Sequence, residues 1–90
     1  MKYLTLDKNG EFHLEPTKGN VFQRESTTIK FFSGLGAATV TFGCRDKAGA
    51  FSAYKDGVID QDAVINHGAG AAVIALVENY STEIKIGYTP

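Results

Sequence analysis

Residues 37–45 read Ala-Ala-Thr-Val-Thr-Phe-Gly-Cys-Arg, and apolar side chains alternate with polar or small ones along this stretch. Val40 and Phe42 fall on one side, and Thr39 and Thr41 fall on the other. A period of two is typical of a β-strand that buries one face and leaves the other wetter. The sequence therefore predicts a strand here. The turn-forming residues that follow it, and the aromatic-bearing residues 50–54, predict that the chain returns as a hairpin.

Similar runs of β-branched, aromatic and alanine residues lie on both sides of this strand. They cover residues 28–32, 71–78 and 83–88 and are separated by Gly, Asn, Asp and Ser. Residues 71–78 also have a helical composition, but their shortness and the lack of a capping residue before them favour a strand. Short strands at about 8–12-residue spacing predict an all-β chain that forms a small antiparallel β-sandwich or barrel.

Two more strands are predicted near the N-terminus. Residues 2–6 and 11–14 flank Asp-Lys-Asn-Gly, in which Asn-Gly supplies the positive φ of a tight turn. The sequence thus predicts an N-terminal β-hairpin and linker over residues 1–20 and a main sheet region over residues 28–88. Residues 55–57 are predicted to form a turn, and residues 71–78 and 83–88 a closing hairpin.

The length and composition indicate one domain without an obvious nucleic-acid or membrane partner. The chain has 90 residues, too few for a second core, and we expect a single domain over residues 1–90. Nine Lys and Arg against ten Asp and Glu give a net charge of −1, and the basic residues are scattered along the sequence, so we expect no nucleic-acid partner. The longest apolar run is shorter than the ~20 residues of a membrane helix. One cysteine and no leader-like start predict synthesis in a reducing cytoplasm.

The residues that could carry chemistry lack partners at a suitable spacing. His13 and His67 are far apart and do not show the short spacings of a zinc site. Cys44 has no histidine near it in the sequence that would activate it as a nucleophile. The acidic residues between 56 and 62 do not match a calcium loop and are expected to form turns. We therefore expect no catalytic, cofactor-binding or metal-binding residue.

Two stretches resemble a known class of viral proteins. AATVTFGCRDKAGAFSAYKDGVI at residues 37–59 and GAGAAVIALVENYSTEIKIGYT at residues 68–89 are similar to the small β-sandwich virion proteins of tailed bacteriophages, of the head-decoration, head-fibre and tail-accessory types. The similarity spans residues 28–88 and consists of strand chemistry. The chain departs from it in offering Phe51 or Tyr54 where those modules usually bear a Trp, and in its N-terminal hairpin.

The resemblance implies a non-enzymatic structural protein that is made in the host cytoplasm and resides in the virion. Its partners would be capsid or tail proteins and other copies of itself, with a trimer expected if the resemblance holds. No catalytic residue is carried over from it.

The strand at residues 71–78 suggests where such copies would meet. Both of its faces are apolar, yet a strand of a two-layer sandwich has one core side. The bulkier Ile74 and Leu76 are expected to face the core, which leaves Val73, Ala75 and Val77 as an oligomer interface. Coverage of this surface by the N-terminal segment is the competing explanation.

Two other classes of function remain open. A carbohydrate-binding or adhesion module would carry aromatic side chains on one exposed face, and the chain has four tyrosines for this purpose: Tyr3, Tyr54, Tyr80 and Tyr88. A small cytoplasmic inhibitor or regulator of a host enzyme would be expected to be monomeric. The sequence contains no motif that decides between these classes.

Overall fold

The computed structural model describes residues 1–17 and 19–90, and Lys18, in the predicted linker, lies outside them. The described residues form strands, turns and loops and no helix, which confirms the all-β prediction. Accordingly, they include no helix that is long and apolar enough to cross a membrane. The strands are β1 (Lys2–Leu6), β2 (Gly10–His13), β3 (Ser26–Ser33), β4 (Thr39–Arg45), β5 (Phe51–Ile59), β6 (Ala63–Asn66), β7 (Ile74–Glu78) and β8 (Ile84–Tyr88).

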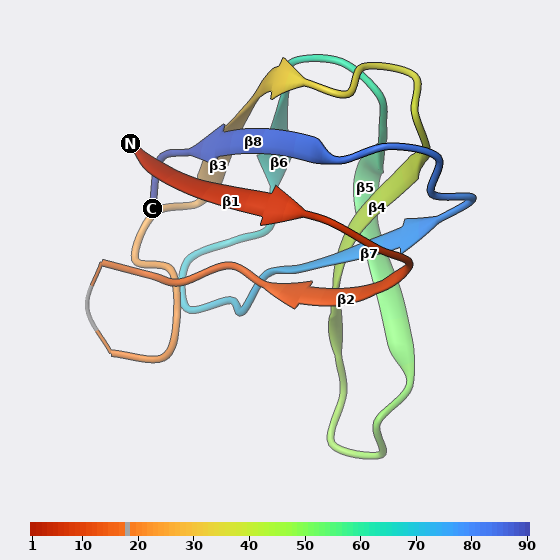
Figure 1. Ribbon diagram of the computed structural model, residues 1–90. Coiled ribbons are helices and arrows are strands. Elements are labelled where there is room, and N and C mark those ends of the chain that lie inside the picture. The colour runs from red at the N-terminus through yellow and green to blue at the C-terminus, as the bar shows by residue number, and fades with distance from the viewer. Residues whose placement is uncertain (18) are drawn as a thin grey trace.

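The strands form two antiparallel sheets that pack face to face (Figure 1). Sheet A has the order β1-β8-β3-β6, and sheet B has the order β2-β7-β4-β5. The pairing is nested, because β1 pairs with β8, β2 with β7, β3 with β6 and β4 with β5. This nested order in two four-stranded sheets is that of the eight-stranded jelly roll, an architecture of two Greek keys.

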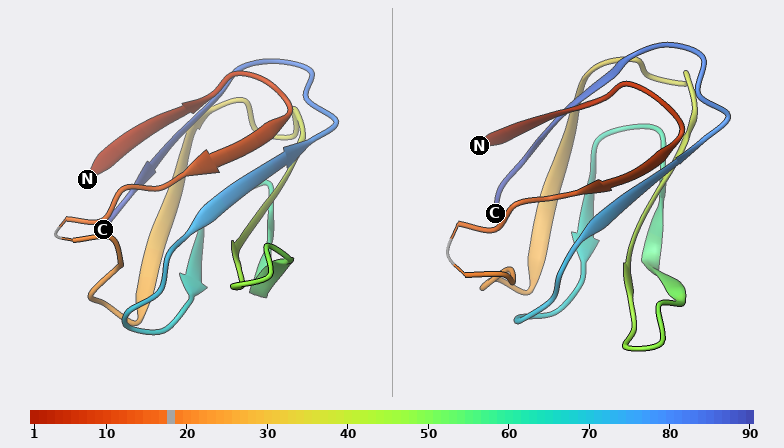
Figure 2. Two further views of the ribbon diagram at one scale, coloured as in Figure 1. Left: turned by 90° about the horizontal axis from the view of Figure 1, so that it is seen from below. Right: turned by 60° about the horizontal axis from the view of Figure 1, so that its bottom comes forward.

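The predicted N-terminal and closing hairpins are wrong, although their strands exist. β1 pairs with β8 in sheet A, whereas β2 pairs with β7 in sheet B, so the chain changes layer after β1 and again after β7. Figure 2 shows both crossings at the same end of the sandwich, where the Tyr80 N–H donates to Asn9 Oδ1 at 2.7 Å. Alternating apolar residues point inward from either layer, so the pattern alone does not distinguish a hairpin from a crossing.

The predicted central hairpin is confirmed, with one difference. β4 and β5 pair directly, for example Cys44 with Ser52. Residues 55–57, predicted as a turn, form instead an irregularity inside the longer strand β5, where the register shifts opposite Phe42. At this point a Cβ on Gly57 would lie 2.4 Å from the Phe42 carbonyl oxygen, so only glycine allows the two backbones to approach this closely.

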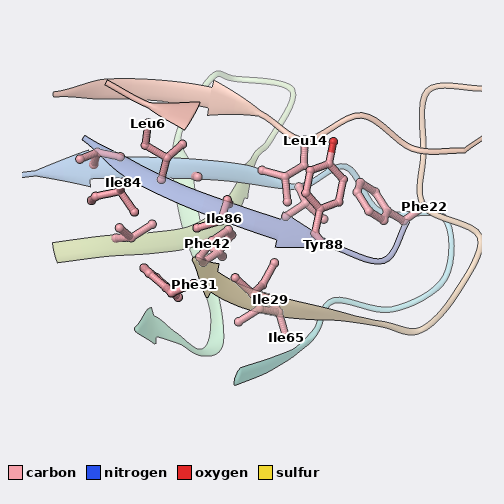
Figure 3. Packing of buried hydrophobic residues seen from close by; sticks show 14 residues of the cluster. Leu6, Leu14, Phe22, Ile29, Phe31, Phe42, Ile65, Ile84, Ile86 and Tyr88 are labelled. Carbon is pink, nitrogen blue, oxygen red and sulfur yellow. The ribbon is translucent and has the colours of Figure 1, made fainter. Parts of the chain in front are cut away.

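The space between the sheets is filled by apolar side chains (Figure 3). Phe42 of sheet B and Ile86 of sheet A are fully buried, as is Phe22, which lies in the loop before β3. The Phe22 and Tyr88 rings are 6.2 Å apart at one end of this core. The interior of the jelly roll is therefore a packed core.

The predicted oligomer interface on β7 is wrong, because its residues belong to this core. Val73, Ala75 and Val77 are at most 2% exposed. Ala75 lies between Phe12 and Phe42 in the register of sheet B, and the space between two phenylalanines takes a small side chain. Side-chain bulk was therefore a misleading criterion for choosing the core face of the strand.

The opposite face of β7 carries Ile74 and Leu76, which point away from the core. Ile74 is nevertheless buried, because the Phe51 ring reaches over Gly43, the residue that pairs with Ile74. A Cβ on Gly43 would lie 2.7 Å from Phe51 Cζ. Sheet B thus covers its own outward isoleucine.

Ala75→Asp tests this assignment of faces. A carboxylate between Phe12 and Phe42 would be buried without a partner, so we expect the free energy of unfolding to fall by about 3 kcal/mol or more. The matched control is Leu76→Asn on the outward face of the same strand, with an expected loss of about 1 kcal/mol. Urea unfolding followed by circular dichroism measures both values. An Ala75→Asp variant that keeps wild-type stability but changes mass in light scattering would restore the interface assignment.

Candidate functional site: an exposed aromatic face on sheet A

The structure keeps the residues singled out for chemistry apart. His13 is exposed and lies 4.0 Å from Glu11 at its nearest atoms. His67 is part of the framework: its ring nitrogens lie 2.7 Å from Thr27 Oγ1 and from the Gly68 carbonyl oxygen. Within residues 1–17 and 19–90, no three His, Cys, Asp or Glu side chains come together as metal ligands would.

Cys44 and the aspartates also have structural surroundings. Cys44 is a partly buried free thiol beside Tyr54, and burial together with this thiol raises the pKa of the tyrosine hydroxyl. Asp62 Oδ1 accepts a hydrogen bond of 2.8 Å from the Phe31 N–H, and Asp56 has a positive φ within β5. Asp60 lines an open groove on the sandwich surface.

The four tyrosines do not form a common platform. Tyr3 is 70% exposed, whereas Tyr88 is buried and Tyr54 and Tyr80 are half-buried. The Tyr54 hydroxyl donates to the Ala72 carbonyl oxygen, which fixes its ring against the loop before β7. Of the tyrosines, Tyr3 alone presents most of its ring to a binding partner.

Tyr3 instead meets a phenylalanine on the outer face of sheet A. Its ring centroid is 5.4 Å from that of Phe32, with the two planes tilted by 56°. Phe32 is 50% exposed and Met1 is 54% exposed. We call Met1, Tyr3 and Phe32 the aromatic face. Met1 directly precedes β1, Tyr3 lies in β1 and Phe32 lies in β3; β1 and β3 flank β8 in the sheet.

Gly87 of β8 makes room for this cluster. It pairs with Tyr3 on one side and with Lys30 on the other. A Cβ on Gly87 would lie 2.6 Å from Met1 Sδ and 2.7 Å from Phe32 Cε2. The side chains of Met1 and Phe32 therefore lie directly on the glycine backbone, and the aromatic face is seated on the middle of the sheet.

Two lysines border the aromatic face. The Lys30 ammonium lies 5.6 Å from the centroid of the Phe32 ring, within the range of a cation–π interaction. Lys85 points outward from β8, opposite Thr5. A depression of about 210 Å³ lies beside the rings and is lined by Tyr3, Leu4, Thr5, Phe32, Lys85 and Ile86.

Comparison with known proteins adds no relative to this picture. No protein-family model matches the chain, and the searches of curated sequences and of solved structures give no match either. The function is therefore inferred from the geometry of the site.

Sequence reasoning did not identify the aromatic face. The alternation in Thr28–Phe32 carried part of the signal, since Phe31 is buried and Phe32 must then point outward. The sequence alone does not show that these residues are neighbours, because Tyr3 and Phe32 are brought together on either side of β8, which begins 52 residues after Phe32. Lys30 lies beside Phe32 because the two residues are two positions apart on β3, whereas Lys85 is brought beside the rings by the pairing of β8 with β1 and β3.

Gly87→Ala tests how the aromatic face is seated. The atoms that a new Cβ would meet are the far ends of flexible side chains, so Met1 and Phe32 can move and the loss of unfolding free energy should stay within about 1 kcal/mol. The contact between Tyr3 and Phe32 should change. Proton NMR shifts of the two rings report this contact, and unchanged ring shifts or a collapse of stability would contradict the description.

Tyr88 is expected to make the free energy of unfolding depend on pH in the alkaline range. Burial raises the pKa of its hydroxyl, opposed by the hydrogen bond of 2.8 Å that the Glu15 N–H donates to it. A raised pKa means that the contribution to stability is present below the unfolded value of about 10 and is lost as the pH rises towards the folded value. We expect urea unfolding between about pH 8 and about pH 11 to show a smaller alkaline decline for Tyr88→Phe than for the wild type. An equal decline in the two proteins would show that Tyr88 does not contribute.

Proposed function

We propose that the protein is a non-enzymatic structural component of a bacteriophage virion that acts by binding capsid or tail proteins. The aromatic face of sheet A is the observation that carries this proposal. Exposed apolar clusters usually mark interaction sites on soluble domains, and Tyr, Phe and Met are enriched in protein interfaces. Tyr3, Phe32 and Met1 are such residues, each at least half exposed.

The architecture gives independent support. Jelly rolls occur in viral capsid domains, in lectins and in cupins, so the fold fits a virion role without specifying it. The interior of this jelly roll is occupied by side chains such as Phe22, Phe42 and Ile86. A packed interior favours a function carried by the outer surface.

Self-association remains part of the proposal through the resemblance to virion proteins. The residues predicted as the oligomer interface do not support it, since Val73, Ala75 and Val77 lie in the core. Light scattering of the purified wild-type protein measures the copy number directly, with a trimer as the expectation.

A carbohydrate-binding module is the second candidate, and the pair Tyr3 and Phe32 is the observation that favours it. Sugars stack on flat, accessible aromatic faces, whereas these rings are tilted by 56° to each other and Lys30 lies over the Phe32 ring. Protein contact is therefore favoured over sugar binding. A regulator of a host enzyme could use the same face for such a contact.

The virion proposal predicts where the protein is found. Its gene should lie beside capsid, portal or tail genes, and particles purified from the corresponding lysate should contain the protein in a fixed copy number relative to the major capsid protein. Quantitative mass spectrometry of gradient-purified particles measures this ratio. Recovery in the soluble lysate alone would contradict the virion role and leave a host-enzyme regulator as the better explanation.

A further inference from the structure

We propose that the aromatic face of sheet A binds an acidic segment of a partner protein, with one apolar side chain of that segment in the depression between Tyr3 and Phe32. The carboxylates of the segment would lie on Lys30 and Lys85. This inference rests on the proposed function in requiring a protein partner, and it adds the chemistry of that partner.

The outer face of sheet A carries positive charge. In the register of sheet A, the outward-pointing positions of its four described strands include Lys30 and Lys85 and no carboxylate. The whole chain carries more acidic than basic residues, so this face differs in sign from the molecule as a whole. Charge complementarity between surfaces favours an acidic partner.

The same charges disfavour a symmetric contact between two copies. In a twofold contact each partner presents the same patch. Two sheet A faces would then bring Lys30 and Lys85 of one copy against the lysines of the other without an intervening carboxylate. Like charges across an interface oppose association, so the occupant that fits is a different, acidic surface.

The depression beside the rings is small. Its volume of about 210 Å³ is below the range of about 300–1,000 Å³ of typical small-molecule sites. The Tyr3 and Phe32 rings give it apolar walls, and Thr5 and Lys85 lie along the same lining. Such a site suits one apolar side chain with a carboxylate close to it in the sequence.

Nucleic acid offers a similar combination of ring and negative charge, but the observations favour a protein. Single-stranded nucleic acid is bound by stacking together with a positively charged groove that follows the backbone. Here two lysines border the rings and the net charge of the chain is −1. Phe32 also has Lys30 over its ring, which leaves less of that ring for stacking.

The test is a titration of the ¹⁵N-labelled protein with three peptides, followed by NMR. The probe is acetyl-Glu-Asp-Phe-Glu-Asp-amide, and the controls are acetyl-Gln-Asn-Phe-Gln-Asn-amide and acetyl-Glu-Asp-Ala-Glu-Asp-amide. We expect the probe to bind with a dissociation constant of about 1 mM or lower and to shift the amide signals of Thr5, Lys85 and Gly87. Each control should bind at least about tenfold more weakly, and the probe should weaken between about 0.05 and about 0.5 M salt.

Matched variants locate the site. Phe32→Ser and Lys85→Gln should each weaken the probe about three- to tenfold. Val58→Ser and Lys55→Gln change an exposed valine and an exposed lysine on sheet B and should leave binding unchanged. Gly87→Ala, which displaces Met1 and Phe32 at the surface, should weaken the probe while the fold is retained.

Equal binding of the charged and uncharged peptides would overturn the inference, and so would shifts that fall on sheet B. If oligothymidylate or a maltooligosaccharide bound more tightly than the probe peptide and shifted the Gly87 amide signal, the face would bind another class of ligand. That result would also overturn the inference. The virion proposal fails separately, through particles that lack the protein. Particles that contain a protein without affinity for the acidic probe would remove this inference alone.

Discussion

The structure depends on the packing of Phe12 and Phe42 around Ala75 between the two sheets. Phe12, Ala75 and Phe42 lie side by side across three paired strands. Because side chains alternate along a strand, their inward position fixes which face of β2, β4 and β7 points towards the core. The orientation of the adjacent residues is then fixed as well, so Ile74 and Leu76 must point outward. Ala75 is the smallest residue of β7, and its size leaves room for the two phenylalanine side chains on either side of it.

The same constraint acts from the other layer and determines the outer surface of sheet A. Ile84, Ile86 and Tyr88 fill the core from β8, so Lys85 and Gly87 point outward between β1 and β3. Gly87 then leaves space for Met1 and Phe32 to lie on the backbone of β8. The aromatic face is thus a consequence of core packing in register.

The sequence predicted those parts of the fold that depend on local patterns. The alternation of residues 37–45 and the turn after them correctly predicted β4, the start of β5 and their pairing. Strand pairing across the sandwich depends on contacts between distant residues, which is why β1 and β2 were placed in one hairpin although they lie in different sheets. The aromatic face was missed for the same reason, since it needs β8 between β1 and β3.

The two outer surfaces of the sandwich differ in a way that bears on function. Sheet B shields its outward Ile74 with the Phe51 ring, and the ion pair between Arg45 of β4 and Glu11 of β2 spans β7 on that surface. Sheet A leaves Tyr3 and Phe32 exposed beside two lysines that no carboxylate of the same sheet face neutralises. Covering an apolar side chain from within the chain is therefore feasible in this fold. Because sheet A does not do so, an outside partner is the more economical explanation for its apolar and basic surface.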